Sequence, residues 1–443
     1  MTRMETLIAT LAVILIIPVV ATAGKVQPPS CEKPVEIIKA NAEVIGLDDA
    51  IDLAFSNSPE LYALCQRAKA AEKAMKQEAL IPNPELEFEI EEFGGTGEFE
   101  EGESGERTFM LSQELEMGKR GRRKEVGTKE LNTAVTEYEL GRLRVAREVK
   151  FSFYRVAVME KKVSLMEERV EAAELVHNAV SARVRAGKVS PVEEKKSEVA
   201  LSEARIALAD TRRELDSARL SLSVIWGSEE PEFESVRSDL TRTVEPSGWQ
   251  AVAALLEDSP ALVLSRTEVE TRKAELELER WRSIPNVTLG FGLKSYEATD
   301  DTAYVAAASV PVPIFDRNQG AKGEALYRLK EGEAVHNSTR LMVRRDLFSA
   351  YQSLVSSYEG VKSLEKDVLP SAESVYSSTE QGYRAGKFDY LELLDSQERL
   401  FQAREEYLSR LYEYHEARAT VDYLTGSDIY TDNDTLKENE NEG

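Results

Sequence analysis

The stretch Val184–Gly227 reads VRAGKVSPVEEKKSEVALSEARIALADTRRELDSARLSLSVIWG, and Tyr383–Gly426 reads YRAGKFDYLELLDSQERLFQAREEYLSRLYEYHEARATVDYLTG. The two stretches align without a gap at a constant offset of 199 residues, and 13 of the 44 positions are identical. The identities include Arg-Ala-Gly-Lys at 185–188 and 384–387. Charged helices share a few residues by chance but not such an ordered series, so the chain contains two copies of one unit.

Shorter matches occur in the earlier part of each copy. Ser-Pro-x-Leu stands at 58–61 and 259–262, and Ile-Pro-Asn stands at 81–83 and 284–286. The division that follows is an N-terminal extension at 24–45, a first repeat at 46–247, a second repeat at 248–426 and an acidic tail at 427–443. We expect the tail to be disordered, because it is short of apolar residues.

The chain begins with an apolar run typical of a secretory signal peptide. Leu7–Val20 follows Arg3 and precedes the small residues at 21–23, so residues 1–23 are predicted to be removed after Ala23. Glu5 offsets the charge of Arg3, whereas a signal peptide normally starts with a net positive charge. The alternatives to a signal peptide are a retained membrane anchor or a buried helix. No second apolar run of spanning length follows, so any membrane-embedded part would have to be built from strands.

Composition excludes several classes of protein. With 31% charged and 42% hydrophobic residues, the chain is neither mostly disordered nor a polytopic helical membrane protein. The net charge of −24 argues against binding to nucleic acid, which needs a basic surface. It is compatible with a conduit for cations, although a solvated acidic surface is the better explanation for most of these groups. The sequence predicts no cofactor.

The two cysteines allow two hypotheses. Cys31 and Cys65 could form a disulfide in an oxidising compartment. Acylation of Cys31 is the alternative, but Pro28-Pro29-Ser30 before it lacks the aliphatic residue usual at such sites.

Each repeat is predicted to start with a helix and to continue with a much longer one. The first helix has about 35 residues, Leu47–Ile81 or Trp249–Ile284, and the Pro-Asn pair ends it. After a strand hairpin, a helix of about 65 residues begins near Arg122 or Gly320. At 1.5 Å per residue such a helix is roughly 100 Å long, which indicates coiled-coil packing.

Glycines mark the ends of the long helices. Gly187 and Gly386 suit the left-handed position at a helix C-terminus. A returning helix of about 37 residues then runs to Gly227 or Gly426. Each repeat therefore contains a long helical hairpin with a tight tip.

Between the helices, apolar and polar residues alternate as in strands. The first repeat alternates the carboxylates Glu85, Glu87, Glu89 and Glu91 with the apolar residues Leu86, Phe88 and Ile90. In the second repeat Val287, Leu289, Phe291 and Leu293 alternate with small or polar residues. The partner stretches run over 109–117 and 304–314, after loops at 94–106 and 297–302.

Strands of about ten residues have the length that spans a bilayer. Four strands cannot close a barrel, and open edges are not tolerated in lipid, so two or three chains would have to share one barrel. Leu86, Phe88, Ile90, Val287, Leu289 and Phe291 would then face lipid, and the four glutamates would face the lumen. There the glutamates would favour cations or simply keep the wall wet. Soluble hairpins packed on the helices are the alternative.

The order of helix, hairpin and helical hairpin, repeated once, resembles the TolC-like outer-membrane efflux factors over nearly the whole mature chain. The resemblance is carried by Tyr383-Arg384-Ala385-Gly386-Lys387 with Leu391-Glu392-Leu393-Leu394-Asp395 at the second tip. Gly118-Lys119-Arg120 and the stretch Ile81-Pro82-Asn83-Pro84-Glu85-Leu86 resemble the subgroup for heavy-metal efflux of the cobalt–zinc–cadmium type.

That resemblance implies a mainly α-helical protein whose homotrimer combines a twelve-stranded membrane β-barrel with a periplasmic α-helical tunnel. It also implies docking to a periplasmic adaptor (membrane fusion) protein and to an inner-membrane pump of the RND type. The first tip, Val189–Val192, is less leucine-rich than the family pattern. The two adaptor sites are therefore not expected to be equivalent.

A passive duct needs a closable end rather than a catalytic group. The tip residues Gly187, Gly386 and Tyr383 and the carboxylates Asp389, Glu392 and Asp395 are the candidate gate. In a trimer the carboxylates would ring the periplasmic mouth, where repulsion or bound cations could set its opening. The alternative is that they only stabilise a helix start.

Pro370 distinguishes the second long helix, because its repeat counterpart is Glu171. Proline removes a backbone hydrogen bond, so it should bend this helix. The second hairpin is therefore predicted to be the inner, curved one that narrows the entrance.

Other functions are disfavoured. The sequence has no phosphate loop, nucleophile elbow or zinc-binding helix motif, so it is not predicted to be an enzyme. His177, His336 and His415 lack ligand spacing and are predicted to serve surface or packing roles. A periplasmic coiled-coil adaptor or scaffold is the main rival to a duct. Metal, drug and protein remain open as cargo.

Overall fold

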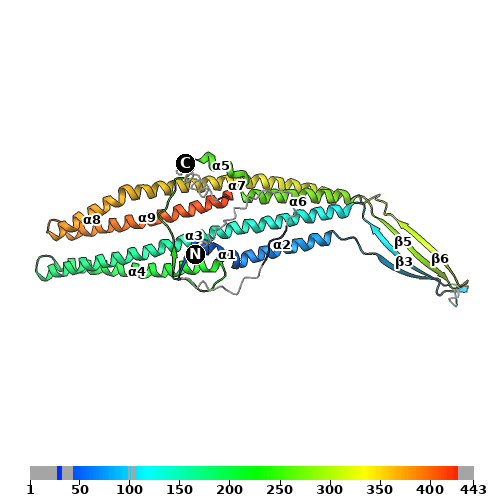
Figure 1. The fold of residues 1–443 in the computed structure, drawn as a ribbon, viewed down its shortest axis with the longest axis horizontal. Coiled ribbons are helices and arrows are strands. Elements are labelled where there is room, and N and C mark those ends of the chain that lie inside the picture. The colour runs from blue at the N-terminus through cyan, green and yellow to red at the C-terminus, as the bar shows by residue number, and fades with distance from the viewer. Residues whose placement is uncertain (1–26, 32–42, 98–99, 101–104, 428–443) are drawn as a thin grey trace, which may run out of the picture.

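The computed structural model describes residues 27–31, 43–97, 100 and 105–427. The predicted signal peptide and all of the predicted tail after Ser427 lie outside the described residues. The molecule is elongated and mostly helical, with two helical hairpins pointing one way and a β-sheet at the opposite end (Figure 1). Within the described residues, none of the helices combines the length and the apolar character needed to cross a membrane.

The first helix of each repeat is broken, so the prediction of single helices over Leu47–Ile81 and Trp249–Ile284 is wrong. The elements are α1 Leu47–Asn57 and α2 Pro59–Glu78, then α5 Trp249–Ala254, a 3₁₀ turn Leu255–Asp258 and α6 Pro260–Arg282. The breaks fall at Ser58 and Ser259, because a residue before proline is driven out of the helical conformation. The proline then starts the next helix, where its missing N–H costs nothing.

The long helical hairpins are as predicted. The first consists of α3 Lys119–Arg185 and α4 Pro191–Ile225. The second consists of α7 Gln319–Ser363, a π-helical segment Leu364–Val368, α8 Leu369–Arg384 and α9 Tyr390–Thr425. At both tips the predicted glycine has a positive φ, +69° at Gly187 and +74° at Gly386, a conformation that only glycine adopts without strain.

The π-helical segment lies directly before Pro370. Proline cannot donate the backbone hydrogen bond of a regular helix, and a wider turn accommodates that loss. In Figure 1 the helix changes direction along α8 toward its tip, whereas α3 runs to its tip without a break.

Four antiparallel strands form the sheet in the order β2-β3-β5-β6. They are β2 Glu85–Glu91, β3 Glu106–Leu115, β5 Val287–Tyr296 and β6 Asp301–Ser309. The predicted partner strands are three residues too late at the start of each strand and run too far at the other end, because residues 116–118 and 310–318 leave the ladder as irregular connections. β3 pairs with β5, so one sheet joins the two repeats.

The connection at 228–247 contains one short strand. β4 Ser235–Arg237 pairs in parallel with β1 Val44–Gly46. Val236 N–H donates to Glu160, and the Tyr414 hydroxyl bonds both backbone groups of Val244. These contacts hold the connection against α3 and α9.

Candidate functional site

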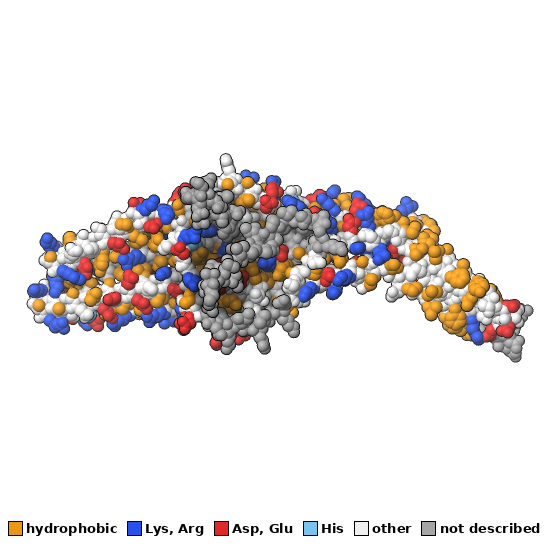
Figure 2. All heavy atoms as spheres, in the orientation of Figure 1, with side chains coloured by type: hydrophobic (Ala, Val, Ile, Leu, Met, Phe, Trp, Pro, Cys, Tyr) orange, Lys and Arg blue, Asp and Glu red, His pale blue; other side chains and the backbone are white. Residues whose placement is uncertain are grey.

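The sheet has one apolar face and one acidic face. The strand register places on the apolar face Leu86, Phe88, Ile90, Phe109, Leu111, Leu289, Phe291, Leu293 and Tyr304. All nine side chains are exposed in the single chain, with values such as 76% for Leu86 and 80% for Tyr304. Figure 2 shows hydrophobic side chains gathered over this end of the molecule and charged side chains spread over the helices. Such an exposed patch marks a surface that contacts lipid or another protein.

The opposite face carries carboxylates and small residues. Its acidic members are Glu85, Glu87, Glu89, Glu91, Glu106, Glu114 and Asp301. Glycines Gly290 and Gly292 and alanines Ala303 and Ala307 also point to this side. The alternation predicted for the first hairpin is therefore confirmed, and Val287, Leu289 and Phe291 share the face of Leu86 and Phe88.

Both outer strands of the sheet have a free edge within the described part of the chain. β2 pairs only with β3, and β6 pairs only with β5. Each edge therefore presents a row of unpaired backbone donors and acceptors that can pair with a strand of another chain.

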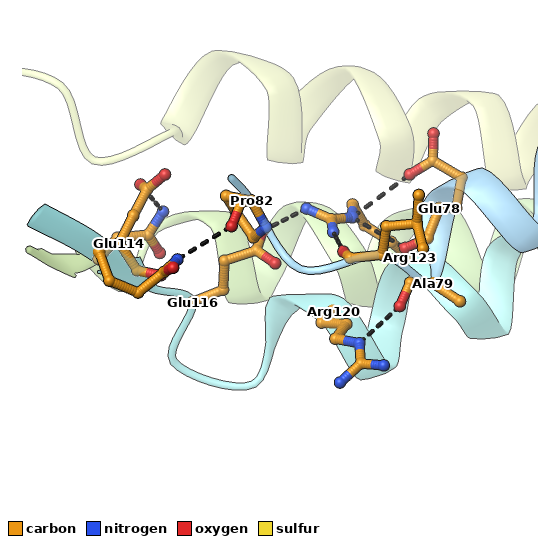
Figure 3. Close-up of polar contacts among 10 residues, drawn as sticks. Glu78, Ala79, Pro82, Glu114, Glu116, Arg120 and Arg123 are labelled. Atoms are coloured by element: carbon orange, nitrogen blue, oxygen red, sulfur yellow. Dashed lines mark hydrogen bonds and ion pairs between the residues drawn. The ribbon is translucent and has the colours of Figure 1, made fainter. Parts of the chain in front are cut away.

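Two arginines fasten the first repeat where strand meets helix (Figure 3). Arg123 donates to the carbonyls of Glu78 (3.2 Å) and Leu80 (2.8 Å) and is paired with the buried carboxylate of Glu116. Arg120 Nε donates to Ala79 O over 2.6 Å. The last carbonyls of α2 have no partner within the helix, and arginines there also complement the helix dipole.

In the second repeat, the side-chain amide of Asn318 bonds a carbonyl near the C-terminal end of α6. Asn318, at φ +58° before α7, donates Nδ2 to Glu279 O (2.8 Å) and to the Glu279 carboxylate (2.7 Å). Its counterpart before α3 is Gly118, at φ +84°, where a Cβ would come within 2.6 Å of the Trp281 ring. Gly118 of the predicted Gly-Lys-Arg motif thus allows close packing, and Arg120 of that motif bonds to α2.

A charged groove lies where α2, α3, α6 and α7 come together. Its volume is about 690 Å³, and all four helices contribute to its walls. Glu137 pairs with Arg67 at 2.8 Å on one side, and Arg272 pairs with Glu275 at 3.0 Å on the other. Burial, reinforced by the negative charge of Glu275, raises the pKa of Glu130 above the ordinary value for a glutamate. The groove thus combines side chains of both charges with small apolar ones.

The comparison with protein families fits this architecture. A family model described as "Outer membrane efflux protein" matches residues 50–228 and again residues 251–427. The chain belongs to the outer membrane efflux protein family. The resemblance inferred from the second tip and from the order of elements is therefore confirmed.

Relatives of this efflux protein include proteins named for metal resistance. It is 32% identical over 383 residues to the cobalt-zinc-cadmium resistance protein CzcC of Cupriavidus metallidurans, covering 86% of this chain and 90% of the relative. It is 26% identical over 305 residues to the nickel and cobalt resistance protein CnrC of the same organism, covering 68% and 71%. The solved structure of CusC, a transmembrane channel, superposes with a TM-score of 0.74 at 17% identity, covering 91% of this chain and 99% of CusC. That likeness confirms a TolC-like fold.

The two hairpin tips of the efflux protein are packed together. Val180 of α3, Tyr383 of α8, and Tyr390 and Leu393 of α9 form one buried cluster. Arg183 of α3 stacks its guanidinium 4.6 Å from the centre of the Tyr383 ring and donates to the Tyr383 carbonyl over 3.3 Å. Sequence analysis missed Arg183, because its partner lies 200 residues away.

The carboxylates predicted to form a gate have local partners. Asp389 accepts from the Glu392 backbone N–H (2.9 Å), and the Glu392 side chain accepts from the Asp389 N–H (2.9 Å). This is a capping box that starts α9, which the Asp-x-x-Glu spacing could have predicted. Asp395 pairs with Arg399 at 2.9 Å. These contacts fit the helix-start alternative, and a role in gating stays a prediction.

The histidines lie in packing positions. His177 bonds Ser197 (2.9 Å) and His336 bonds Ser265 (2.8 Å). His415 is buried, stacks on Tyr154 and bonds Leu240 O, and burial lowers its pKa to about 4. The described part of the chain brings no three His, Cys, Asp or Glu residues into an arrangement that could hold a metal ion.

A disulfide joins Cys31 to Cys65 of α2. It fastens residues 27–31 to this helix, and the Lys69 ammonium donates to the Cys31 carbonyl over 3.3 Å. Of the two hypotheses for Cys31, the structure supports the disulfide, which leaves no free thiol to acylate.

Proposed function

We propose that three copies of this chain form a passive duct through the outer membrane, with one shared barrel of twelve strands and a helical tunnel in the periplasm. The observation that carries the proposal is the open four-stranded sheet with an exposed apolar face. A water-soluble protein would bury such a face, so its exposure favours contact with lipid. In lipid the free edges of β2 and β6 must pair. Pairing β6 of one copy with β2 of the next closes these edges and leaves the apolar face in contact with lipid.

The polar surfaces would then line the passage. The acidic face of the sheet lies opposite the apolar face, so it faces the lumen when the apolar face contacts lipid. The charged groove among α2, α3, α6 and α7 is a candidate for the tunnel wall beyond it. Conduction through such a wall needs no catalytic residue, because water and small solutes move down a gradient.

The helical tips would form the periplasmic entrance. Phe388 and Leu391 are exposed there, 41% and 54% respectively, and offer apolar contacts to an adaptor protein. An inner-membrane pump of the RND type would deliver cargo through that adaptor. The π-helical interruption before Pro370 and the change of direction along α8 support a second hairpin that leans inward and narrows the entrance. The candidate gate would then lie near the narrowest point, at the tips marked by Gly187 and Gly386. Its side chains are those of Tyr383, Asp389, Glu392 and Asp395.

Divalent metal cations are the proposed cargo. The proposal rests on the names of the relatives CzcC and CnrC and on the acidic face of the sheet. Hydrophobic drugs and secreted proteins are the alternative cargoes.

A matched pair of substitutions tests the membrane assignment. Leu111 and Ser112 are neighbours on β3 and point to opposite faces. Leu111→Arg places a charge against lipid and should cost about 2–4 kcal/mol, whereas Ser112→Arg faces the lumen and should be tolerated. Trimers in the outer-membrane fraction are the measurement. A wild-type protein recovered as a soluble monomer, or equal effects of the two variants, would support a periplasmic scaffold instead.

The cargo is tested by growth of a deletion strain. Loss of the gene should sensitise cells to zinc, cobalt, cadmium or nickel, and the wild-type chain should restore resistance where Leu111→Arg does not. Sensitivity to hydrophobic drugs alone would redirect the proposal to drug export.

A further inference from the structure

The acidic face of the sheet holds one basic side chain. The register of β2, β3, β5 and β6 places seven carboxylates on this face. Among the described residues of these four strands, Lys294 is the only basic residue on the same face. Arg107 points to the other face, where it pairs with Glu297. Lys294 is therefore the sole positive charge that these strands would offer to a passage.

Lys294 reaches two carboxylates at once. Its ammonium lies 2.9 Å from Glu91 Oε2 and is also paired with Glu106. Glu91 and Glu106 are directly opposite each other on β2 and β3, an arrangement in which like charges repel. Lys294 comes from β5, on the far side of β3 from β2, and its side chain reaches across β3 to offset one of these two negative charges.

The contacts divide the acidic face along its length. Glu91 and Glu106 lie at the hairpin-loop end, where Lys294 pairs with both and offsets one of their two charges. Glu85, Glu87 and Glu89 follow toward the helices, with exposed side chains and no ion pair among the described residues. The charge of the face is thus carried mainly by the section nearer the helices.

We propose that Lys294 sets the ion selectivity of the duct by offsetting one of the two negative charges of Glu91 and Glu106 at the loop end of its lumen. The proposal rests on the proposed function, because it requires the acidic face to line a passage. Removing Lys294 would expose one more negative charge per chain, or three in a trimer. The lumen would then attract cations more strongly and repel anions, while a guanidinium at the same position would preserve the balance.

The test is the reversal potential of purified trimers in a planar bilayer under a salt gradient. Lys294→Met should raise the cation-to-anion permeability ratio about two-fold, a size expected for three charges across a screened, water-filled lumen. Lys294→Arg should leave the ratio unchanged. Glu91→Gln alone should lower the ratio, because it removes one negative charge per chain and leaves Lys294 balanced by Glu106.

A double variant separates selectivity from a purely structural role. Lys294→Met combined with Glu91→Gln has the net charge of the wild type, so its ratio should return to the wild-type value. Trimers of Lys294→Met that conduct with an unchanged ratio would overturn the inference alone. So would a ratio that stays raised in the double variant. Wild-type trimers that form no conducting channel would overturn the proposed function and the inference with it.

Discussion

The two hairpin tips descend from the same repeated sequence but are packed differently. Under the offset of 199 residues, Gly382 corresponds to Arg183, and Phe388 corresponds to Val189. In the second tip the Phe388 ring lies against Gly382 so closely that any Cβ there would overlap the ring. In the first tip Arg183 instead reaches across to Tyr383 of the second. The second tip thus packs against its own residues, whereas the first tip contacts the second through Arg183.

The long helices that lead to the two tips also differ, because only the second one is interrupted. α3 runs without interruption through Glu171, whereas a π-helical segment interrupts the second helix before Pro370. The interruption lets the second helix bend where α3 stays continuous, so the two hairpins follow different paths to tips that are packed together. In the proposed duct, the first hairpin would therefore support the assembly and the second would shape its entrance.

The largest expected effect comes from giving the first hairpin the proline of the second. Glu171→Pro removes a backbone hydrogen bond within α3, where no π-helical segment absorbs the loss, and should destabilise the protein by about 3 kcal/mol or more. Thermal unfolding of the purified protein measures it, and Glu171→Ala is the control. An unchanged midpoint for Glu171→Pro would show that α3 is as adaptable as its counterpart.

The next effect tests the self-packing of the second tip. Gly382→Ala should cost about 1–3 kcal/mol, because its methyl group overlaps the Phe388 ring. Hydrogen exchange of the backbone around 376–393 should become faster. Combining it with Phe388→Ala should cost less than the sum of the two single changes, and strict additivity would contradict the packing argument.

Pro370→Ala should alter permeability more than stability. Alanine restores the missing donor, so the helix can straighten and widen the entrance, while the free energy of unfolding should change by no more than about 1 kcal/mol. Uptake of a small antibiotic that the intact outer membrane excludes is the measurement, with Ser371→Ala as the neighbouring control. Unchanged uptake would argue against an entrance narrowed by the second hairpin.

The smallest effect concerns the contact between the tips. Arg183→Ala removes the guanidinium stacked on Tyr383 and should cost about 0.5–1 kcal/mol. Hydrogen exchange at 383–390 should rise, and Arg183→Lys should restore part of the protection because it keeps the charge but not the planar group. Equal protection in all three proteins would mean that the buried cluster around Val180 alone joins the tips.

Some features of this protein follow from its sequence alone. The repeat, the tight turns at Gly187 and Gly386 and the two faces of the strands depend on local rules, namely the left-handed conformation of glycine and the two-residue period of a strand. The capping box of Asp389 and Glu392 and the breaks at Ser58 and Ser259 are also local. The sequence offers the helix start at Asp389 and Glu392 as one of two interpretations, and the Ser-Pro pairs at 58–59 and 259–260 carry the signal for the breaks.

Only the tertiary structure decided which of these elements meet. Pairing of β3 with β5, the bonds from Arg123 to the end of α2 and the stacking of Arg183 on Tyr383 join residues far apart in the chain. Periodicity states which side of an element is apolar but not which partner covers it. That choice depends on how the two repeats pack against each other, and it gives equivalent positions in the two copies different roles.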